Sequence, residues 1–98
     1  MIIVLAKAIP NDESAKEKVI DFAQDLITKS KLEDGNVDYN LFANTGDGSL
    51  MFVEQWESKE ILGKHLQTEH FLNFGKNIDG LLAADLEINV FDADATDL

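Results

Sequence analysis

Segments in which the apolar residues have the spacing of a strand alternate along this chain with segments in which they have the spacing of a helix. This order of segments limits the fold more than any other feature. Ile2 to Ile9 is mostly aliphatic, as in a strand covered on both faces, and Pro10-Asn11-Asp12 ends it. From Ser14, which with Glu17 has the spacing of a capping box, the apolar positions follow the helical repeat. These positions are Ala15, Val19, Phe22, Ala23, Leu26 and Ile27. The sequence therefore predicts a first strand followed by a long helix.

The middle of the chain has the pattern of a β-hairpin. Asp34-Gly35-Asn36 is typical of a turn, and apolar and polar side chains then alternate from Val37 to Asn44, as in a strand. Gly46-Asp47-Gly48 favours a tight connection, because glycine and aspartate accept positive φ angles. The returning strand is expected from Leu50 to Trp56.

Two helical segments and a last strand are predicted for the remainder. Ser58 is placed to cap a short helix, and Thr68 is placed to cap a second one. Alternation indicates a last strand from Leu86 to Phe91. The order βαββαβ, with the second helical segment broken near Thr68, is that of a ferredoxin-like α+β fold. In this fold an antiparallel four-stranded sheet carries its helices on one face.

The chain of 98 residues is expected to form one domain over residues 1–92, followed by an acidic tail over residues 93–98. The first strand is apolar on both faces, and the strand from Leu50 to Trp56 is apolar on both faces over its first half. Helices on one side of a sheet leave the other side uncovered, and a large apolar face is unusual on a soluble monomer. We therefore expect a homodimer whose sheets pack face to face.

The charge of the chain restricts its ligands. Nineteen acidic residues oppose eight lysines, the formal net charge is −11, and there is no arginine. This balance argues against binding to nucleic acid or to anionic membranes, and the lack of guanidinium groups disfavours a phosphorylated substrate. A neutral, largely apolar or aromatic ligand fits better. The chain also lacks cysteine, which is typical of a reducing cytoplasm.

Polar side chains at apolar positions mark a candidate site. His65 lies four residues after Ile61 and should project between its helix and the sheet. It is either a hydrogen-bonded core residue or a base that can take a proton from a phenol. Glu54 and Trp56 share one strand face. If this face lies beneath the helices, Glu54 can orient His65; if it lies outside, Glu54 belongs to the dimer interface. Tyr39, on the neighbouring strand, is a further donor.

The sequence offers little support for a metal or nucleotide site. His65 and His70 are five residues apart, so on one continuous helix they would not share a face, and the spacing of zinc protease helices is missed by one residue. No metal site is therefore expected, and no phosphate-binding loop or dinucleotide motif is present.

Several of these residues together resemble a known family. Glu54-Gln55-Trp56-Glu57-Ser58, His65-Leu66-Gln67-Thr68 and His70, preceded by Gly35 and Tyr39, are similar to the antibiotic biosynthesis monooxygenase domain, and most to its quinol monooxygenase-like members. The resemblance covers nearly the whole domain. It implies a dimeric α+β barrel that oxygenates quinols or anthrones with O2 and needs no metal, flavin or other cofactor.

The resemblance also suggests roles for residues of this chain. His65 and Glu54 would be catalytic, and Tyr39, Trp56, Phe52, Leu66 and His70 would contact the substrate. Haem-degrading relatives carry other residues at the positions of Lys7 and His65, so haem degradation is not expected. Two alternatives stay open: a non-catalytic binding or stress-related dimeric module that uses the same cavity, and an isomerase of a sugar-derived signal on the same scaffold.

Overall fold

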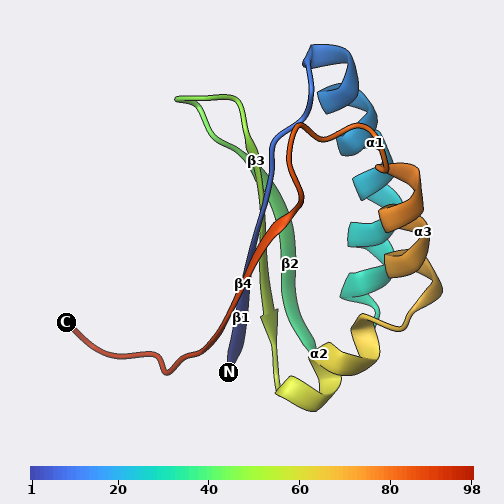
Figure 1. The fold of residues 1–98 in the computed structure, drawn as a ribbon. Coiled ribbons are helices and arrows are strands. Elements are labelled where there is room, and N and C mark those ends of the chain that lie inside the picture. The colour runs from blue at the N-terminus through green and yellow to red at the C-terminus, as the bar shows by residue number, and fades with distance from the viewer.

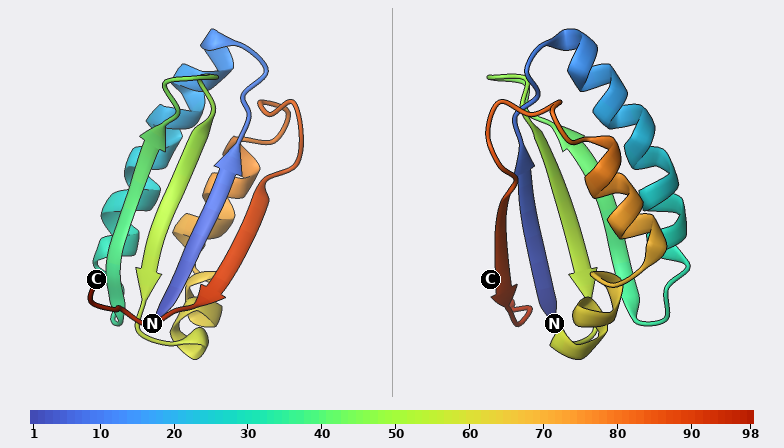
Figure 2. Two further views of the ribbon diagram at one scale, coloured as in Figure 1. Left: turned by 90° about the vertical axis from the view of Figure 1, so that its left-hand side faces the viewer. Right: turned by 45° about the vertical axis from the view of Figure 1, so that its right-hand side comes forward.

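A computed structural model describes residues 1–98 as a sheet with helices on one face (Figure 1). The elements are β1 (Ile2–Ala8), α1 (Glu13–Lys31), β2 (Asn36–Ala43), β3 (Leu50–Trp56), α2 (Lys59–His65), α3 (Glu69–Asn77) and β4 (Glu87–Asp92). The sheet has the strand order β2-β3-β1-β4, and all its pairs are antiparallel. Figure 2 shows the four strands side by side, with α1 and α3 behind them in the left-hand view. The predicted ferredoxin-like fold is confirmed.

The N-cap of the long helix lies two residues before the predicted one. The N-cap of α1 is Asp12, whose Oδ1 accepts a hydrogen bond of 2.8 Å from the backbone N–H of Ala15. Ser14 lies inside the first turn, so the capping box predicted for Ser14 and Glu17 is wrong. Aspartate caps a helix as well as serine does, and its charge also suits the positive end of the helix dipole.

The register of the sheet decides which strand face is covered. β1 and β3 both alternate strictly, with their even-numbered residues buried and their odd-numbered residues partly exposed. Val4 is opposite Glu54, and Ile2 is opposite Trp56. Glu54 and Trp56 are both buried, on the same side as the core residue Phe52. This face lies beneath the helices, which settles the question that the sequence left open.

The second helical segment breaks where the sequence predicts. Ser58 Oγ accepts a hydrogen bond from Ile61 N–H (3.2 Å), and Thr68 Oγ1 accepts one from Phe71 N–H (3.3 Å), so both predicted caps are confirmed. The Thr68 hydroxyl also donates to the carbonyl oxygen of His65 at 2.7 Å. The chain turns between α2 and α3 and brings the His65 and His70 rings to a centroid distance of 5.9 Å.

A close approach of backbone and side chain fixes the turn between α1 and β2. Gly35 has φ +90°, and a Cβ atom built there would lie 2.2 Å from Cδ1 of Ile61 in α2. The carbonyl oxygen of Gly35 accepts a hydrogen bond of 3.0 Å from Glu57 N–H. Only glycine fits this position. The turn therefore packs directly against α2 and carries Glu33, two residues earlier, toward His65.

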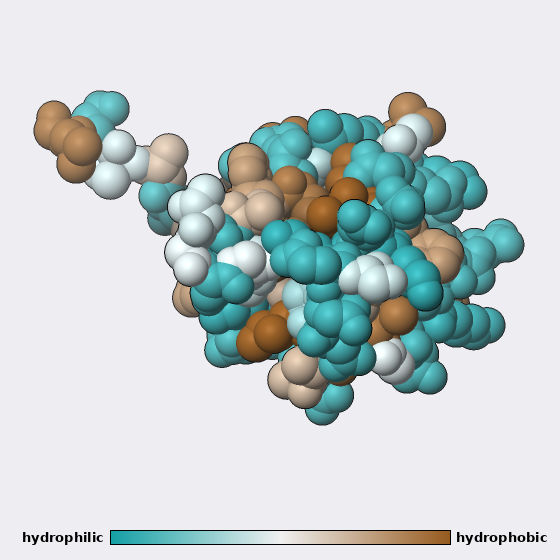
Figure 3. Space-filling view, turned by 90° about the horizontal axis from the view of Figure 1, so that it is seen from above, coloured by the Kyte–Doolittle hydropathy of each residue, from teal (hydrophilic) through white to brown (hydrophobic).

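The last strand is the least covered element. All residues of β4 are exposed, and the tail beyond it has no regular structure and extends away from the body of the molecule (Figures 1 and 3). The N-terminal amine donates to the carbonyl oxygen of Ala93 at 3.2 Å. None of the helices combines the length and the apolar composition that crossing a membrane requires.

Candidate functional site

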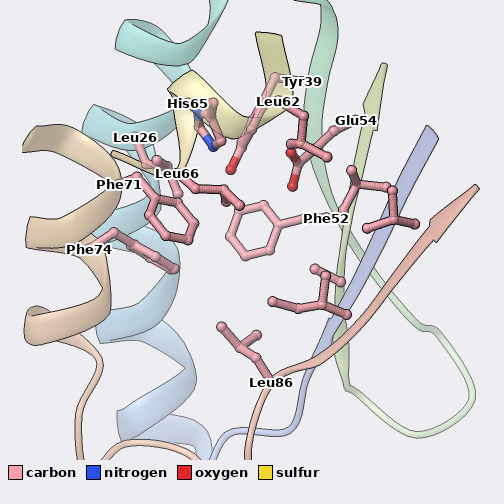
Figure 4. Close-up of a pocket in the computed structure, with 14 residues that line it drawn as sticks. Leu26, Tyr39, Phe52, Glu54, Leu62, His65, Leu66, Phe71, Phe74 and Leu86 are labelled. Atoms are coloured by element: carbon pink, nitrogen blue, oxygen red, sulfur yellow. The ribbon is translucent and has the colours of Figure 1, made fainter. Parts of the chain in front are cut away.

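A cavity lies between the helices and the inner face of the sheet (Figure 4). Its volume is about 110 Å³, and its lining is almost wholly apolar. The polar side chains that reach it are Tyr39 from β2, Glu54 from β3 and His65 from α2. The other lining residues are Val4, Ala6, Leu26, Phe52, Leu62, Leu66, Phe71, Phe74, Leu86, Ile88 and Val90. No lysine lines the cavity, so it suits an uncharged apolar ligand with a few oxygen atoms.

His65 is held by a carboxylate outside the cavity. Its side chain is only 1% exposed, and its Nδ1 lies 2.6 Å from Oε2 of Glu33. The same oxygen lies 2.8 Å from Nε2 of His70. An ionised carboxylate only accepts hydrogen bonds, so Nδ1 of His65 carries the proton of the neutral ring. The remaining nitrogen, Nε2, is then the proton acceptor.

The Nε2 atom of His65 is buried and has no hydrogen-bond partner. The ring packs against Trp56 at a centroid distance of 4.4 Å and against Phe71 at 5.2 Å. Figure 4 shows its edge directed toward the cavity and the hydroxyl of Tyr39. Burial lowers the pKa of His65, although the hydrogen bond and charge of Glu33 oppose this effect. His65 thus presents a neutral, unpaired base to the cavity.

Glu54 approaches the cavity from the sheet. Its side chain is buried, and Oε1 accepts a hydrogen bond of 3.0 Å from the indole N–H of Trp56. Burial raises the pKa of Glu54 to about 7, while the side chains of Trp56 and Tyr39 oppose the rise and the charge of Glu33 adds to it. Tyr39 is the cross-strand neighbour of Glu54. Burial, and then the Glu54 charge, raises the pKa of the Tyr39 hydroxyl, which therefore stays protonated at neutral pH.

The structure brings most of the predicted site residues together. Tyr39, Phe52, Glu54, His65 and Leu66 line the cavity.

Three details differ from the sequence-based expectations. Glu54 does not orient His65: its Oε1 is bonded to Trp56, and the carboxylate at His65 Nδ1 belongs to Glu33. Trp56 is fully buried and does not form a wall of the cavity; it lies behind the cavity and holds Glu54. His70 also lies outside the lining, and its contact is with Glu33.

Glu33 is the residue that sequence reasoning missed. It belongs to no periodic pattern and follows the C-terminal end of α1. Its position depends on the close packing of Gly35 against Ile61, which joins segments far apart in the sequence. The glycine of the turn was the one available signal, and it indicates a tight approach without identifying the partner.

Glu33, His65 and His70 also have the donor set of a metal site, with ligand atoms within 4.8 Å of one another. The helix break makes this possible, so the exclusion based on five-residue spacing along one helix does not hold. Both histidine nitrogens are already hydrogen-bonded to Oε2 of Glu33. Each histidine therefore has one nitrogen paired with Glu33, while Nε2 of His65 stays without a partner.

The chain is similar to several known proteins. It is 31% identical over 88 residues to the Bacillus subtilis protein named "Putative monooxygenase YcnE". This alignment covers 89% of this chain and 93% of that protein. It is 33% identical over 90 residues to the uncharacterized Synechocystis protein sll1783. This alignment covers 91% of this chain but only 61% of that protein. The structure of Rv0793 from Mycobacterium tuberculosis has the same fold, with a TM-score of 0.90 at 24% identity, over 97% of this chain and 96% of that one.

The family comparison agrees with the fold and with the motif residues. Residues 1–77 match the model of the family described as antibiotic biosynthesis monooxygenase. The matched segment includes Glu33, Tyr39, Glu54, His65 and His70, and it ends before β4. This chain belongs to the antibiotic biosynthesis monooxygenase family.

Proposed function

We propose that this protein is a cofactor-independent monooxygenase that uses O2 to oxidise a quinol- or anthrone-like aromatic molecule in the cavity. The observation that carries the proposal is the unpartnered Nε2 of His65, buried at the edge of an apolar cavity, while Nδ1 is held by Glu33. An unpaired buried polar atom costs free energy, so its retention calls for a reason. Membership of the family supports an oxygenase reaction.

His65 is the base in this reaction. Its Nε2 takes a proton from a ring hydroxyl of the bound quinol, which leaves an electron-rich phenolate. A ring carbon of the phenolate then gives electrons to O2, and a C–O bond forms. For a quinol the balance is quinol plus O2 to hydroxyquinone plus water, so the substrate supplies all the electrons.

The other cavity residues bind and stabilise the substrate. The Tyr39 hydroxyl, which stays protonated, donates to the negative oxygen that develops on the substrate. Phe52 and Leu66 provide apolar surface for the ring. Glu33 positions His65, and His70 supports Glu33. The cavity has no cationic side chain, which disfavours an isomerase acting on a phosphorylated sugar.

Oxygen consumption by chelator-treated protein tests this function. A panel of hydroquinones and anthrones is compared for wild type and His65→Ala, with correction for spontaneous autoxidation. Lys64→Ala is the matched control, because Lys64 is exposed on the same helix and does not line the cavity. Uptake should be lost in His65→Ala, by about 10²-fold or more, and kept in Lys64→Ala. Ligand binding without enzyme-dependent uptake would instead indicate the non-catalytic binding module.

We also propose that the protein is a homodimer joined through the outer sheet face. Ile3, Leu5, Met51 and Val53 lie on this face, away from the helices, and are partly exposed. In register, Leu5 is opposite Val53, and Ile3 and Met51 lie diagonally beside this pair, so these four side chains form an apolar area that Gln55 and Lys7 border. A second copy would remove this area from water.

A further inference from the structure

Glu54 is the one carboxyl group that reaches the cavity, and its surroundings are unusual for a carboxylate. The side chain is 5% exposed and lies on the helix-facing side of β3. Trp56 donates to Oε1, and Figure 4 shows the carboxyl group directed into the cavity. Trp56 leaves the second oxygen, Oε2, for the Tyr39 hydroxyl beside it and for a ligand in the cavity.

No positive charge compensates Glu54. The titratable groups that face it are Tyr39 from β2, His65 from α2 and Glu33 from the turn after α1. Across the strand in β1 lies Val4, and β4 contributes only Ile88 and Val90 to the cavity lining. Tyr39 and His65 are neutral at pH 7, and Glu33 is acidic. An ionised Glu54 would therefore be a buried charge without a counter-ion, which is costly.

This environment shifts the pKa values of His65 and Glu54 in opposite directions. Burial lowers the pKa of the imidazole and raises that of the carboxyl group to about 7. Figure 4 shows the two groups on opposite sides of the cavity, with the Tyr39 hydroxyl between them. Two titratable groups separated in this way are typical of an acid and a base in one active site.

We propose that Glu54 is a second catalytic group, a neutral carboxylic acid that donates a hydrogen bond and then its proton to an oxygen atom of the ligand, opposite the base His65. As a catalytic role, this inference rests on the proposed oxygenase function. The role of Glu54 in ligand binding does not depend on that function. The site then selects an uncharged ligand that carries an oxygen acceptor for Glu54, and it discriminates against carboxylates and phosphates.

The proton of Glu54 is needed at the step in which the hydroperoxide formed from the substrate and O2 loses water. After O2 has added, His65 returns its proton to the peroxide oxygen, and a ring C–O–OH group results. His65 then takes the proton from the same ring carbon, the C–H electrons form the C=O bond, and the O–O bond breaks. The distal oxygen leaves with the proton of Glu54 as water. Proton transfer from His65 to Glu54 restores both groups, and the net change is loss of one water from the hydroperoxide.

Binding of acetophenone tests the acid form of Glu54 without turnover. Its carbonyl oxygen accepts hydrogen bonds, and the molecule has no hydroxyl that His65 could deprotonate. If only the protonated form of Glu54 binds, a pKa of about 7 makes the dissociation constant rise about tenfold between pH 6 and pH 8. In Glu54→Gln the amide donates at every pH, so the constant should not change over this range. Lys64→Ala should behave as wild type.

A calorimetric measurement on the wild type keeps the test valid if Glu54→Gln fails to fold. Acetophenone binding is measured at pH 8 in two buffers that differ in ionisation enthalpy, and close to one proton should be taken up per ligand bound. At pH 6 the uptake should be close to zero. Equal affinity at pH 6 and pH 8, or no proton uptake at pH 8, would overturn the inference.

The two proposals fail in different ways. Proton-linked binding of acetophenone with no oxygen uptake on any quinol would refute the oxygenase function and retain Glu54 as the acid that recognises the ligand. Oxygen uptake with binding that does not depend on pH would refute the role of Glu54 alone. If both hold, Glu54→Gln should lower kcat by at least tenfold with little change in KM, because the amide still binds the ligand but supplies no proton.

Discussion

Replacement of Glu54 by glutamine should stabilise the protein in a way that grows with pH. The pKa of Glu54 is about 7 in the fold and 4.5 for the solvated side chain. Below pH 4.5 the carboxyl group is protonated in both the folded and the unfolded state, and it costs nothing. Between pH 4.5 and pH 7 the unfolded state loses its proton first, so the free energy of unfolding falls. At about 1.4 kcal/mol for each pH unit, the full loss is about 3 kcal/mol above pH 7.

Glutamine keeps the shape of the side chain and an oxygen that accepts from Trp56, but it does not ionise. Chemical denaturation followed by circular dichroism, at one protein concentration, gives the free energy of unfolding of both proteins at pH 4.5 and pH 8. The gain from Glu54→Gln should be about 3 kcal/mol larger at pH 8 than at pH 4.5. Taking this difference removes the general effect of the net charge, which both proteins experience. A gain that is the same at both pH values would show that the environment of Glu54 does not disfavour its charge.

Three further changes test the positions of other groups. Glu33→Ala should lower kcat and move the acid limb of the pH–rate profile to lower pH, because the Glu33 carboxylate raises the pKa of His65 and holds its ring; an unmoved profile would contradict this. Gly35→Ala should lower the free energy of unfolding by roughly 2 to 5 kcal/mol, since it combines a positive φ with a clash against Ile61; an unchanged melting temperature would refute the close approach. Leu5→Lys should convert the dimer to a monomer in light scattering, whereas a wild type that is already monomeric would refute the interface.

Much of the fold could be predicted because its signals are local. The caps Ser58 and Thr68 and the turn at Gly35 each act within a few residues, and the structure contains all three. The inward position of His65 follows from helical spacing after Ile61. The cap of the long helix was misjudged because Asp12 and Ser14 are both good capping residues two positions apart, and only the backbone geometry distinguishes them.

The chemistry of the site was harder to predict because it depends on contacts between distant segments. Glu33 and His65 are 32 residues apart and meet only because the turn packs against α2. The partner of Glu54 could not be known until its face was known, since the same residue could have faced a second subunit. Trp56, two residues later on that face, bonds Glu54 and leaves His65 to Glu33.

The contact between the Trp56 and His65 rings gives the protein an optical reporter of its own candidate site. Trp56 is the single tryptophan, is fully buried and lies 4.4 Å from the imidazole, ring centre to ring centre. Indole emission is quenched by a protonated imidazole in contact with it and far less by a neutral one. In Glu54→Gln, intrinsic fluorescence will therefore follow the charge of His65 during titration, without the change that ionisation of Glu54, the partner of the indole N–H, adds in the wild type.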